Sequence, residues 1–267
     1  MATPEAAQGP SPSTEQEPSR EWGPRDGGAP QAVTLVLVRH GMTDATGPSL
    51  AGRTPGIHLN DTGRAQAADL ARRLSDLRPA ALVSSPLERC RETAQALSRQ
   101  LGVPVTTDER FVECDYGSWT LRPFTELRRE PLWKVVQEHP SAVRFPAGEG
   151  MAAAAARAAE AVRDWNTRLL DEASAGDTPA EPPVYVVCSH GDIIKALVAD
   201  ALGMHLDLFQ RIVVDPCSAT SITYTHTRPF LNLLNDTGDN FPAFPSTATT
   251  SGDAAVGGGA GTAGRSS

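Results

Sequence analysis

Short apolar runs, each followed by polar residues, occur at three places along the chain. They cover 33–38, 80–83 and 184–188 and consist mostly of Val, Leu and Ala. A short apolar run bounded by turn residues is typical of a strand that is buried on both faces of a sheet. The sequence therefore predicts three buried strands, the third of them directly after the chain-breaking pair Pro182 and Pro183.

Apolar residues with helical spacing lie between and after these runs. Helices are predicted over 63–77, 86–100, about 149–170 and 193–202. Strands that alternate with helices in this way form a mainly parallel sheet with helices on both faces. We therefore expect an α/β fold, a three-layer sandwich built as one domain.

The predicted helix at 86–100 has its own start signal. Pro86 favours the first helical position, and Glu88 follows three residues after Ser85. A Ser followed three residues later by Glu is the pattern of a capping box, in which both side chains bond backbone N–H groups. We therefore expect Ser85 to cap this helix.

The ends of the chain and one internal stretch have a different composition. Residues 1–31, 171–183 and 236–267 are acidic overall and rich in Pro, Gly, Ser, Thr or Ala. Such segments bury too little apolar surface to offset the entropy lost on ordering. We expect disordered tails at 1–31 and 236–267, an acidic surface loop at 171–183, and one folded domain over 32–235.

The net charge of −8 comes from 24 Lys and Arg against 32 Asp and Glu, and most of it lies in those three segments. The remaining chain is near neutral and shows no basic stripe, so a nucleic-acid partner is not expected. The apolar runs are too short to span a bilayer, and the first residues lack the pattern of a signal peptide. We expect a cytoplasmic protein that does not bind membranes.

The cysteines do not indicate a metal or a disulfide. Cys90, Cys114, Cys188 and Cys217 occur singly, without the spacing of metal ligands. In a reducing compartment thiols of this kind stay reduced. We expect most of them to fill space in the core.

Residues that can hold an anion follow all three predicted strands. Arg39 and His40 end the first strand, Arg89 comes shortly after the second, and His190 follows the third. In α/β sheets the ligand crevice lies beyond the carboxyl ends of the strands, where helix N-termini add N–H donors. The sequence therefore predicts a site for a phosphoryl group.

Four sequence blocks in this order resemble the histidine phosphatase (phosphoglycerate mutase-like) superfamily. The blocks cover 37–43, 84–89, 113–117 and 189–191, and the resemblance extends over about 34–234. Within the superfamily the chain is similar to the bacterial phosphomutase-like and broad phosphatase branch. The resemblance implies a phosphoglycerate mutase-like fold, a small phosphorylated metabolite as substrate, and neither a metal nor an organic cofactor.

The resemblance also implies a role for each matching residue. His40 would attack phosphorus as a neutral imidazole whose other ring nitrogen donates to a backbone carbonyl, and a phosphohistidine would form. Glu113 would protonate the leaving oxygen and then activate water. Arg39, Arg89 and His190 would hold the phosphoryl oxygens and stabilise their developing charge, and Thr43 and Gly191 would lie near the phosphate. We also expect Arg53 near the site as a phosphate-binding candidate, with its role open.

Each catalytic candidate also has an ordinary structural interpretation. His40 alone could be a turn histidine, His190 a core histidine, and Arg89 the partner of a surface ion pair. Glu113 could be a solvated loop acid, and Thr43 could cap a turn. The four blocks together favour catalysis over these readings.

The chain departs from the family pattern just after the first block. Met42 replaces the usual polar residue, and Thr46 stands where the family commonly has an asparagine. Ser49 and Leu50 occupy the region in which an arginine often lies. We therefore expect an altered outer part of the phosphate pocket, so the resemblance leaves the efficiency and the substrate class open.

Three functions are compatible with these residues. A mutase must exclude water from the phosphohistidine with a cover, and the segment available for one, about 119–146, is modest. We therefore predict a phosphatase that hydrolyses small phosphate monoesters through His40. The alternatives are a phosphoglycerate mutase-type phosphomutase with the same nucleophile and a non-catalytic module that binds phosphorylated ligands, although such a module would not need both His40 and Glu113.

Overall fold

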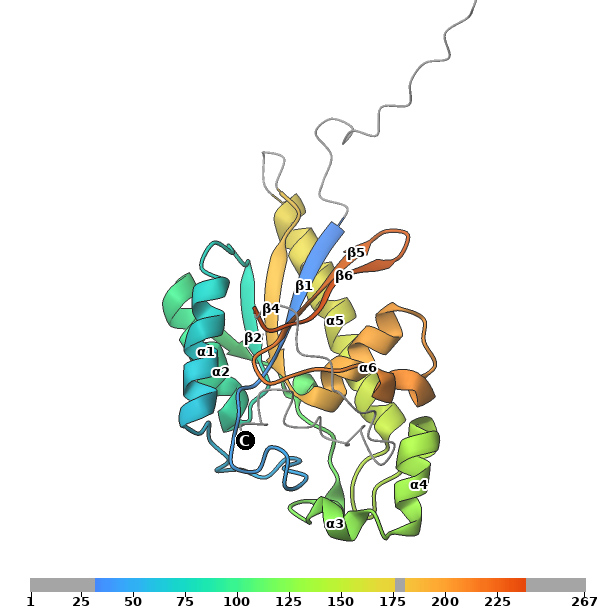
Figure 1. The fold of residues 1–267 in the computed structure, drawn as a ribbon. Helices are drawn as coiled ribbons and strands as arrows, with labels where there is room; N and C mark the ends of the chain where they lie inside the picture. Colours follow the sequence, from blue (N-terminus) through green and yellow to red (C-terminus); the bar gives the residue numbers. More distant parts are fainter. Residues whose placement is uncertain (1–31, 176–180, 239–267) are drawn as a thin grey trace, which may run out of the picture.

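A six-stranded sheet forms the centre of the computed structural model, which describes residues 32–175 and 181–238 (Figure 1). The strand order is β3-β2-β4-β1-β5-β6. Pairings among β1, β2, β3 and β4 are parallel, and β5 pairs antiparallel with β1 and β6. The strands are β1 (Ala32–Arg39), β2 (Ala81–Ser84), β3 (Val105–Thr107), β4 (Val184–Ser189), β5 (Ala219–Thr225) and β6 (Pro229–Asp236).

Helices cover both faces of this sheet (Figure 1). On one face lie α1 (Asp61–Arg73) and α2 (Glu88–Leu101), and on the other lie α5 (Met151–Ser174) and α6 (Gly191–Ala201). The predicted three-layer α/β sandwich with a mainly parallel sheet is therefore confirmed. The shorter elements are the helices α3 (Phe124–Leu127) and α4 (Pro131–Glu138) and the 3₁₀ turns η1 (Glu109–Phe111), η2 (Gly117–Trp119), η3 (Pro140–Ala142) and η4 (Leu206–Arg211).

Strand β1 shows why its run is apolar at almost every position. Val33, Leu35 and Leu37 pack into the core beneath α5 and α6, whereas Val36 and Val38 pack into the core beneath α1 and α2. Successive side chains of a strand point to opposite faces, so a strand between two helical layers buries both sets. Each such buried side chain contributes about 1.5–3 kcal/mol.

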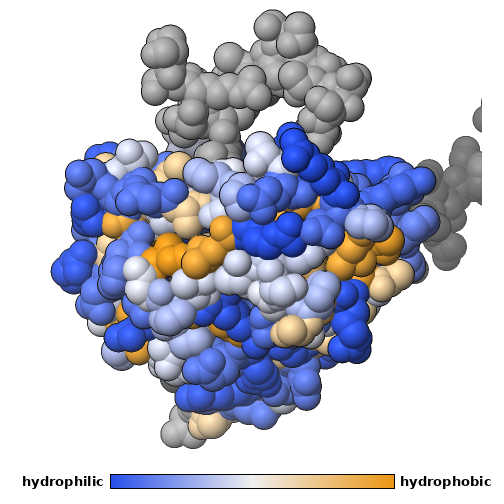
Figure 2. All heavy atoms as spheres, turned by 90° about the horizontal axis from the view of Figure 1, so that it is seen from below, coloured by the Kyte–Doolittle hydropathy of each residue, from blue (hydrophilic) through white to orange (hydrophobic). Residues whose placement is uncertain are grey.

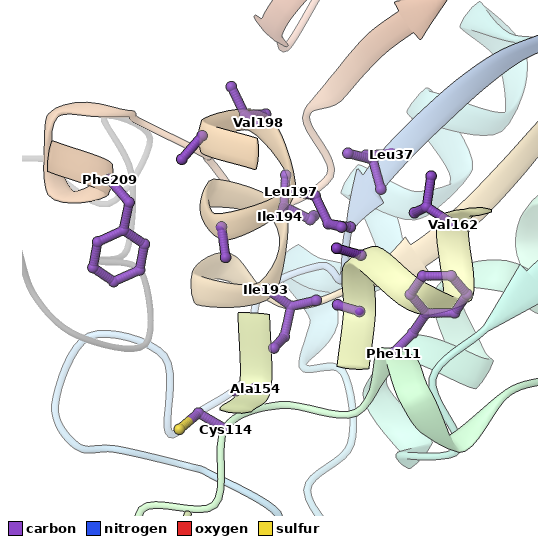
Figure 3. Packing of buried hydrophobic residues seen from close by; sticks show 14 of the residues in the cluster. Leu37, Phe111, Cys114, Ala154, Val162, Ile193, Ile194, Leu197, Val198 and Phe209 are labelled. Atoms are coloured by element: carbon purple, nitrogen blue, oxygen red, sulfur yellow. The ribbon is translucent and has the colours of Figure 1, made fainter. Parts of the chain in front are cut away.

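Helix α6 is buried along nearly its whole length. Figure 3 shows Ile194 beside Leu37 of β1, with Val162 of α5 in the same cluster. A helix that is apolar on most of its sides belongs in a core, and α6 fits that rule apart from its charged residues. Its burial also places two charged side chains, Asp192 and Lys195, inside the protein.

The start of α2 differs from the prediction. The helix begins at Glu88 with Leu87 as its N-cap residue, and no side chain caps it. The hydroxyl of Ser85 lies 2.7 Å from Nε2 of His190 and 3.5 Å from the backbone nitrogen of Leu87. The predicted capping box is therefore wrong, because His190 engages the hydroxyl that would have formed it.

The first residues of the predicted acidic loop belong to a helix. Helix α5 continues to Ser174, so 171–174 are helical and not part of a loop. Residues 176–180 lie outside the described residues, and 181–183 have no regular secondary structure. Helix α1, by contrast, ends at Arg73, four residues before the predicted end.

The folded part extends slightly beyond the predicted boundary at 235. Strand β6 includes Asp236, whose carboxylate accepts a hydrogen bond from Nη1 of Arg73 at 2.8 Å. The expected tails at 1–31 and, from 239 onward, at the other end lie outside the described residues.

Candidate active site

The predicted site residues follow strands that are neighbours in the sheet. Arg39 ends β1 and His40 follows it, while His190 follows β4 as the N-cap residue of α6. Because β2, β4 and β1 are adjacent, their carboxyl ends meet at one edge, where Arg39, His40, Arg89 and Glu113 line a single pocket. Figure 2 views the molecule from this end and shows a mostly hydrophilic face with separate hydrophobic patches.

Two glycines fix the backbone beside the pocket. A Cβ atom on Gly41 would lie 2.6 Å from the carbonyl oxygen of Gly63, and one on Gly63 would lie 2.1 Å from that of Met42. The backbone N–H of Gly41 also donates to the hydroxyl of Thr93 at 3.1 Å. The start of α1 and the middle of α2 therefore hold the segment that directly follows His40.

His40 is held as a neutral imidazole with one defined tautomer. Its Nδ1 lies 2.8 Å from the carbonyl oxygen of Gly41, and because a carbonyl can only accept, Nδ1 carries the proton. Burial, together with the charges of Arg89 and Arg39, lowers the pKa of His40 well below its ordinary value. The lone pair of Nε2 is therefore available, which is what attack on phosphorus requires.

Arg89 is a buried cation with spare hydrogen-bond donors. Its Nη2 donates to the carbonyl of Gly52 at 2.7 Å and to Nδ1 of His190 at 3.2 Å. Its Nε and Nη1 are buried and have no hydrogen-bond partner among the residues that the structure describes. Unpaired donors of a buried cation are costly, and the oxygens of a phosphoryl group would satisfy them.

Both ring nitrogens of His190 contact other side chains. Nδ1 accepts from Arg89, so Nε2 carries the proton and donates to Ser85. Burial, with the charge of Arg89, lowers the pKa of His190 well below its ordinary value. The rings of His190 and His40 meet edge to face with centroids 5.3 Å apart. Gly191 begins α6 next to His190. The phosphate-binding roles expected for Gly191 and His190 stay predictions, and His190 is not among the residues that line the pocket in the described part of the chain.

Glu113 has the titration behaviour of an acid that works near neutrality. Burial, followed by the charge of Asp192, raises its pKa to about 7. Its Oε1 accepts from the backbone N–H of Cys114 at 2.9 Å, which fixes the carboxyl group. Both the protonated and the ionised forms of Glu113 are therefore populated at neutral pH.

Two further site residues were missed by the sequence analysis. Tyr116 lines the pocket, and its hydroxyl donates to Oδ2 of the buried Asp192 at 2.8 Å. Tyr116 lies inside the third sequence block, and Asp192 directly follows the fourth. The available signal was their position within or next to a block, but neither residue type indicates a role by itself.

Arg53 and Thr43 lie beside the pocket and not among its lining residues. Arg53 donates to the backbone carbonyl of Glu113 at 2.9 Å and to the carboxylate of Glu149 at 2.7 Å. The hydroxyl of Thr43 lies 2.9 Å from that of Thr46, and Thr46 does line the pocket. The phosphate-binding roles expected for Arg53 and Thr43 stay predictions.

This fold and pocket define an enzyme that acts on phosphate monoesters. The chain belongs to the histidine phosphatase superfamily (branch 1), whose family model matches residues 35–237. The prediction of a phosphatase of this superfamily is therefore confirmed.

Individual relatives are similar over most of their own length. A glucosyl-3-phosphoglycerate phosphatase of Mycolicibacterium vanbaalenii is 32% identical over 174 residues, which cover 65% of this chain and 76% of that protein. Phosphoserine phosphatase 1 of Hydrogenobacter thermophilus is 28% identical over 211 residues, covering 77% and 93%. The native structure of a mycobacterial glucosyl-3-phosphoglycerate phosphatase superimposes with a TM-score of 0.68 at 27% identity, covering 76% and 99%.

Residues 32–175 and 181–238 contain neither a candidate membrane span nor a candidate metal site. No helix in the described ranges has the length and apolar character that a membrane span needs. In the same part of the chain, no group of three or more His, Cys, Asp or Glu side chains is placed to hold a metal ion.

Proposed function

We propose that the protein hydrolyses small phosphate monoesters through a phosphohistidine on His40. The observation that carries this proposal is the pairing of a neutral His40, whose Nε2 is free to attack, with Glu113, whose pKa is about 7, in one pocket. Arg39 and Arg89 line the same pocket and supply the positive charge. Phosphoryl transfer depends mainly on such positioning and charge stabilisation.

In the first step Nε2 of His40 attacks phosphorus in line with the ester oxygen. The P–N bond forms as the P–O ester bond breaks, and the protonated carboxyl group of Glu113 gives its proton to the departing oxygen. The alcohol leaves, and Glu113 is left ionised. Arg39 and Arg89 stabilise the charge on the remaining phosphoryl oxygens.

In the second step water attacks the phosphohistidine. The carboxylate of Glu113 takes a proton from the water as the new P–O bond forms and the P–N bond breaks. Inorganic phosphate leaves, His40 returns to its neutral form, and Glu113 is protonated again. The segment expected to supply a cover, about 119–146, contains only the short elements α3, α4 and η3 (Figure 1), and this modest size supports hydrolysis over phosphomutase activity.

The first test is loss of the nucleophile. Purified protein should release phosphate from p-nitrophenyl phosphate in the presence of a metal chelator, and His40→Ala should lower kcat by at least about a thousandfold. Rapid quenching at alkaline pH, where the P–N bond survives, followed by mass spectrometry, should locate a phosphoryl group on His40. Turnover by His40→Ala near the rate of the parent protein would contradict the assignment.

The pocket walls indicate the class of substrate. Apart from the two arginines, His40, Glu113 and Tyr116, the residues that line the pocket are small and uncharged: Ala45, Thr46, Gly47, Ser49, Ala51 and Gly52. The next residue, Arg53, directs its guanidinium to Glu149. A carboxylate on the leaving group would therefore find no cation among these six residues, because Arg39 and Arg89 are assigned to the phosphoryl group, and it would lie near Glu113. We propose that the preferred leaving group is an uncharged alcohol.

Glycerol 3-phosphate and 3-phosphoglycerate test this preference, because they share a carbon skeleton and differ only in a hydroxymethyl group against a carboxylate. We expect kcat/KM for phosphate release to be at least about tenfold higher with glycerol 3-phosphate, a difference of about 1.4 kcal/mol. Thr46→Arg adds a cation to the pocket and should reduce the difference in kcat/KM between the two substrates. A preference for 3-phosphoglycerate would contradict the proposal, and its conversion to 2-phosphoglycerate without phosphate release would identify a mutase.

We propose that the enzyme is cytoplasmic and that its partner is a small phosphorylated metabolite. We do not expect it to bind nucleic acid or a membrane. The support for this comes from the sequence. The charge outside the acidic segments is near neutral, and the apolar runs are short.

A further inference from the structure

Three charged residues from distant parts of the chain meet behind Glu113. They are Arg53, in the segment after β1, Glu149, just before α5, and Arg157, within α5. Oε1 of Glu149 accepts from Nη2 of Arg53 at 2.7 Å and from Nη2 of Arg157 at 2.8 Å. We call Arg53, Glu149 and Arg157 the Glu149 clamp.

Both arginines of the Glu149 clamp bind the main chain of Glu113. Nε of Arg53 donates to its carbonyl oxygen at 2.9 Å, and Nη2 of Arg157 donates to the same oxygen at 3.1 Å. Glu149 fixes the next part of the chain, because its Oε1 accepts from the N–H of Asp115 at 3.0 Å and its own N–H donates to the carbonyl of Asp115. The backbone is therefore held on both sides of Cys114.

The Glu149 clamp is a partly buried set of charges. The side chains of Glu149 and Arg157 are 19% and 20% exposed, and that of Arg53 is 37% exposed. Burial alone would raise the pKa of Glu149, but its bonds with Arg157 and Asp115 and the charge of Arg53 outweigh burial and lower it. Glu149 is therefore ionised in the working pH range, and its hydrogen bonds are charge-assisted.

Holding Glu113 through its carbonyl has a chemical advantage. An arginine bonded directly to the carboxyl group would lower its pKa by about 1–3 units and favour the ionised form, which cannot act as an acid. The hydrogen bonds that Arg53 and Arg157 donate to Glu113 end on its carbonyl oxygen, and the pKa of its carboxyl group is about 7. The position is fixed without removing the proton.

We propose that the Glu149 clamp positions Glu113 for proton transfer to the leaving oxygen. This inference rests on the proposed function, in which Glu113 is the general acid. Arg53, Glu149 and Arg157 are then positioning residues, because they act through Glu113 and do not touch the reacting atoms. A misplacement of about 1 Å is enough to lower a rate by about a hundredfold.

The dependence of kcat/KM on the leaving group tests this role. p-Nitrophenolate leaves with little help from an acid, whereas phenolate and benzyl alkoxide need a proton. Since kcat/KM covers the steps up to alcohol release, Glu149→Gln and Arg157→Met should lower it about 10–100-fold for phenyl phosphate and benzyl phosphate. For p-nitrophenyl phosphate the loss should be less than about threefold, because that step barely uses Glu113.

Two further clamp variants test for rescue by a second cation and provide a measurement if Glu149→Gln does not fold. Arg157→Lys keeps a cationic donor and should restore part of the lost activity toward phenyl phosphate. Arg53→Met removes the most exposed member of the clamp, so it provides a folded test protein if Glu149→Gln is unstable. Arg168→Met is the matched control, because Arg168 lies on the same helix and pairs at the surface with Glu172. Its activity toward all three esters should equal that of the parent protein.

Glu113→Gln separates this inference from the proposed function. It should show the same selective loss with poor leaving groups. If Glu113→Gln lowers kcat/KM equally for all three esters, the acid assignment in the proposed function fails. If Glu113→Gln is selective but the folded clamp variants lose activity equally for all esters, or lose none, the positioning role of the Glu149 clamp is wrong.

Discussion

Glu113 carries a carboxyl group whose two protonation states are closely balanced. Burial and the nearby Asp192 favour the protonated form, whereas Arg89 and Arg39 favour the ionised form, and the resulting pKa is about 7. A group that first gives a proton and then takes one works best with a pKa near the working pH. In the proposed reaction, the residues around Glu113 would therefore set the pH range.

Removal of the charge on Asp192 should shift that range. In Asp192→Asn the ionised form of Glu113 no longer faces a neighbouring negative charge, so the pKa of Glu113 falls. The protonated form then disappears at lower pH, and we expect the alkaline limb of the kcat/KM profile for phenyl phosphate to move to lower pH. Profiles measured from about pH 5 to about pH 9 would show this.

A charge on the same helix but outside the pocket provides the control. Asp200 is about half exposed and lies near Arg163 on the surface. Asp200→Asn should leave the alkaline limb where it is. An alkaline limb of Asp192→Asn that stays in place or moves to higher pH would show that Asp192 does not control the acid.

At the scale of elements, α1 packs so closely against the segment after His40 that no side chain fits at Gly63. Alanine is a better helix former than glycine by about 1 kcal/mol, but a Cβ on Gly63 would lie 2.1 Å from the backbone oxygen of Met42. The steric term should win, because backbone cannot move aside as a flexible side chain can. We predict that Gly63→Ala lowers stability by about 1–3 kcal/mol.

The same change should displace His40 and lower kcat/KM by at least about tenfold. Thermal unfolding and kinetics with p-nitrophenyl phosphate measure the two effects. Gly102→Ala is the control, since Gly102 has φ +71° but nothing within 4 Å of its added Cβ. It should cost about 1 kcal/mol from backbone strain and leave kcat/KM unchanged. A fully active, stable Gly63→Ala would refute the argument.

The sequence predicts an element well when residues near it in the chain determine its structure, and poorly when distant residues do. The buried strands β1, β2 and β4 are visible as apolar runs, but β5 alternates Thr and Ser with apolar residues and gave no such run. The capping signal at Ser85 failed because its hydroxyl bonds His190, 105 positions away. The Glu149 clamp was not predicted for the same reason, since Arg53 and Glu149 are 96 positions apart.

For the whole molecule, sheet order explains why the predicted site residues meet. Arg39, His40, Arg89 and His190 were each placed at a strand end by sequence, and the order β2-β4-β1 makes those ends neighbours. Glu113 reaches the same pocket because it lies just after η1. The turn η1 is held against β4, since the hydroxyl of Ser189 donates to the carbonyl of Phe111 at 2.8 Å. The resemblance to the family was needed to predict Glu113. The strand ends alone predicted Arg39, His40, Arg89 and His190.

The central place of β1 also has a consequence for synthesis of the protein. β1 is the first described strand to be made, yet both strands that flank it, β4 and β5, come from the last third of the chain. The side chain of Arg39 bonds the carbonyl of Val214, 175 positions later. While the ribosome is still translating the middle of the chain, His40 has emerged without its pocket. The proposed nucleophile, His40, therefore acquires its surroundings only when nearly the entire domain has been made.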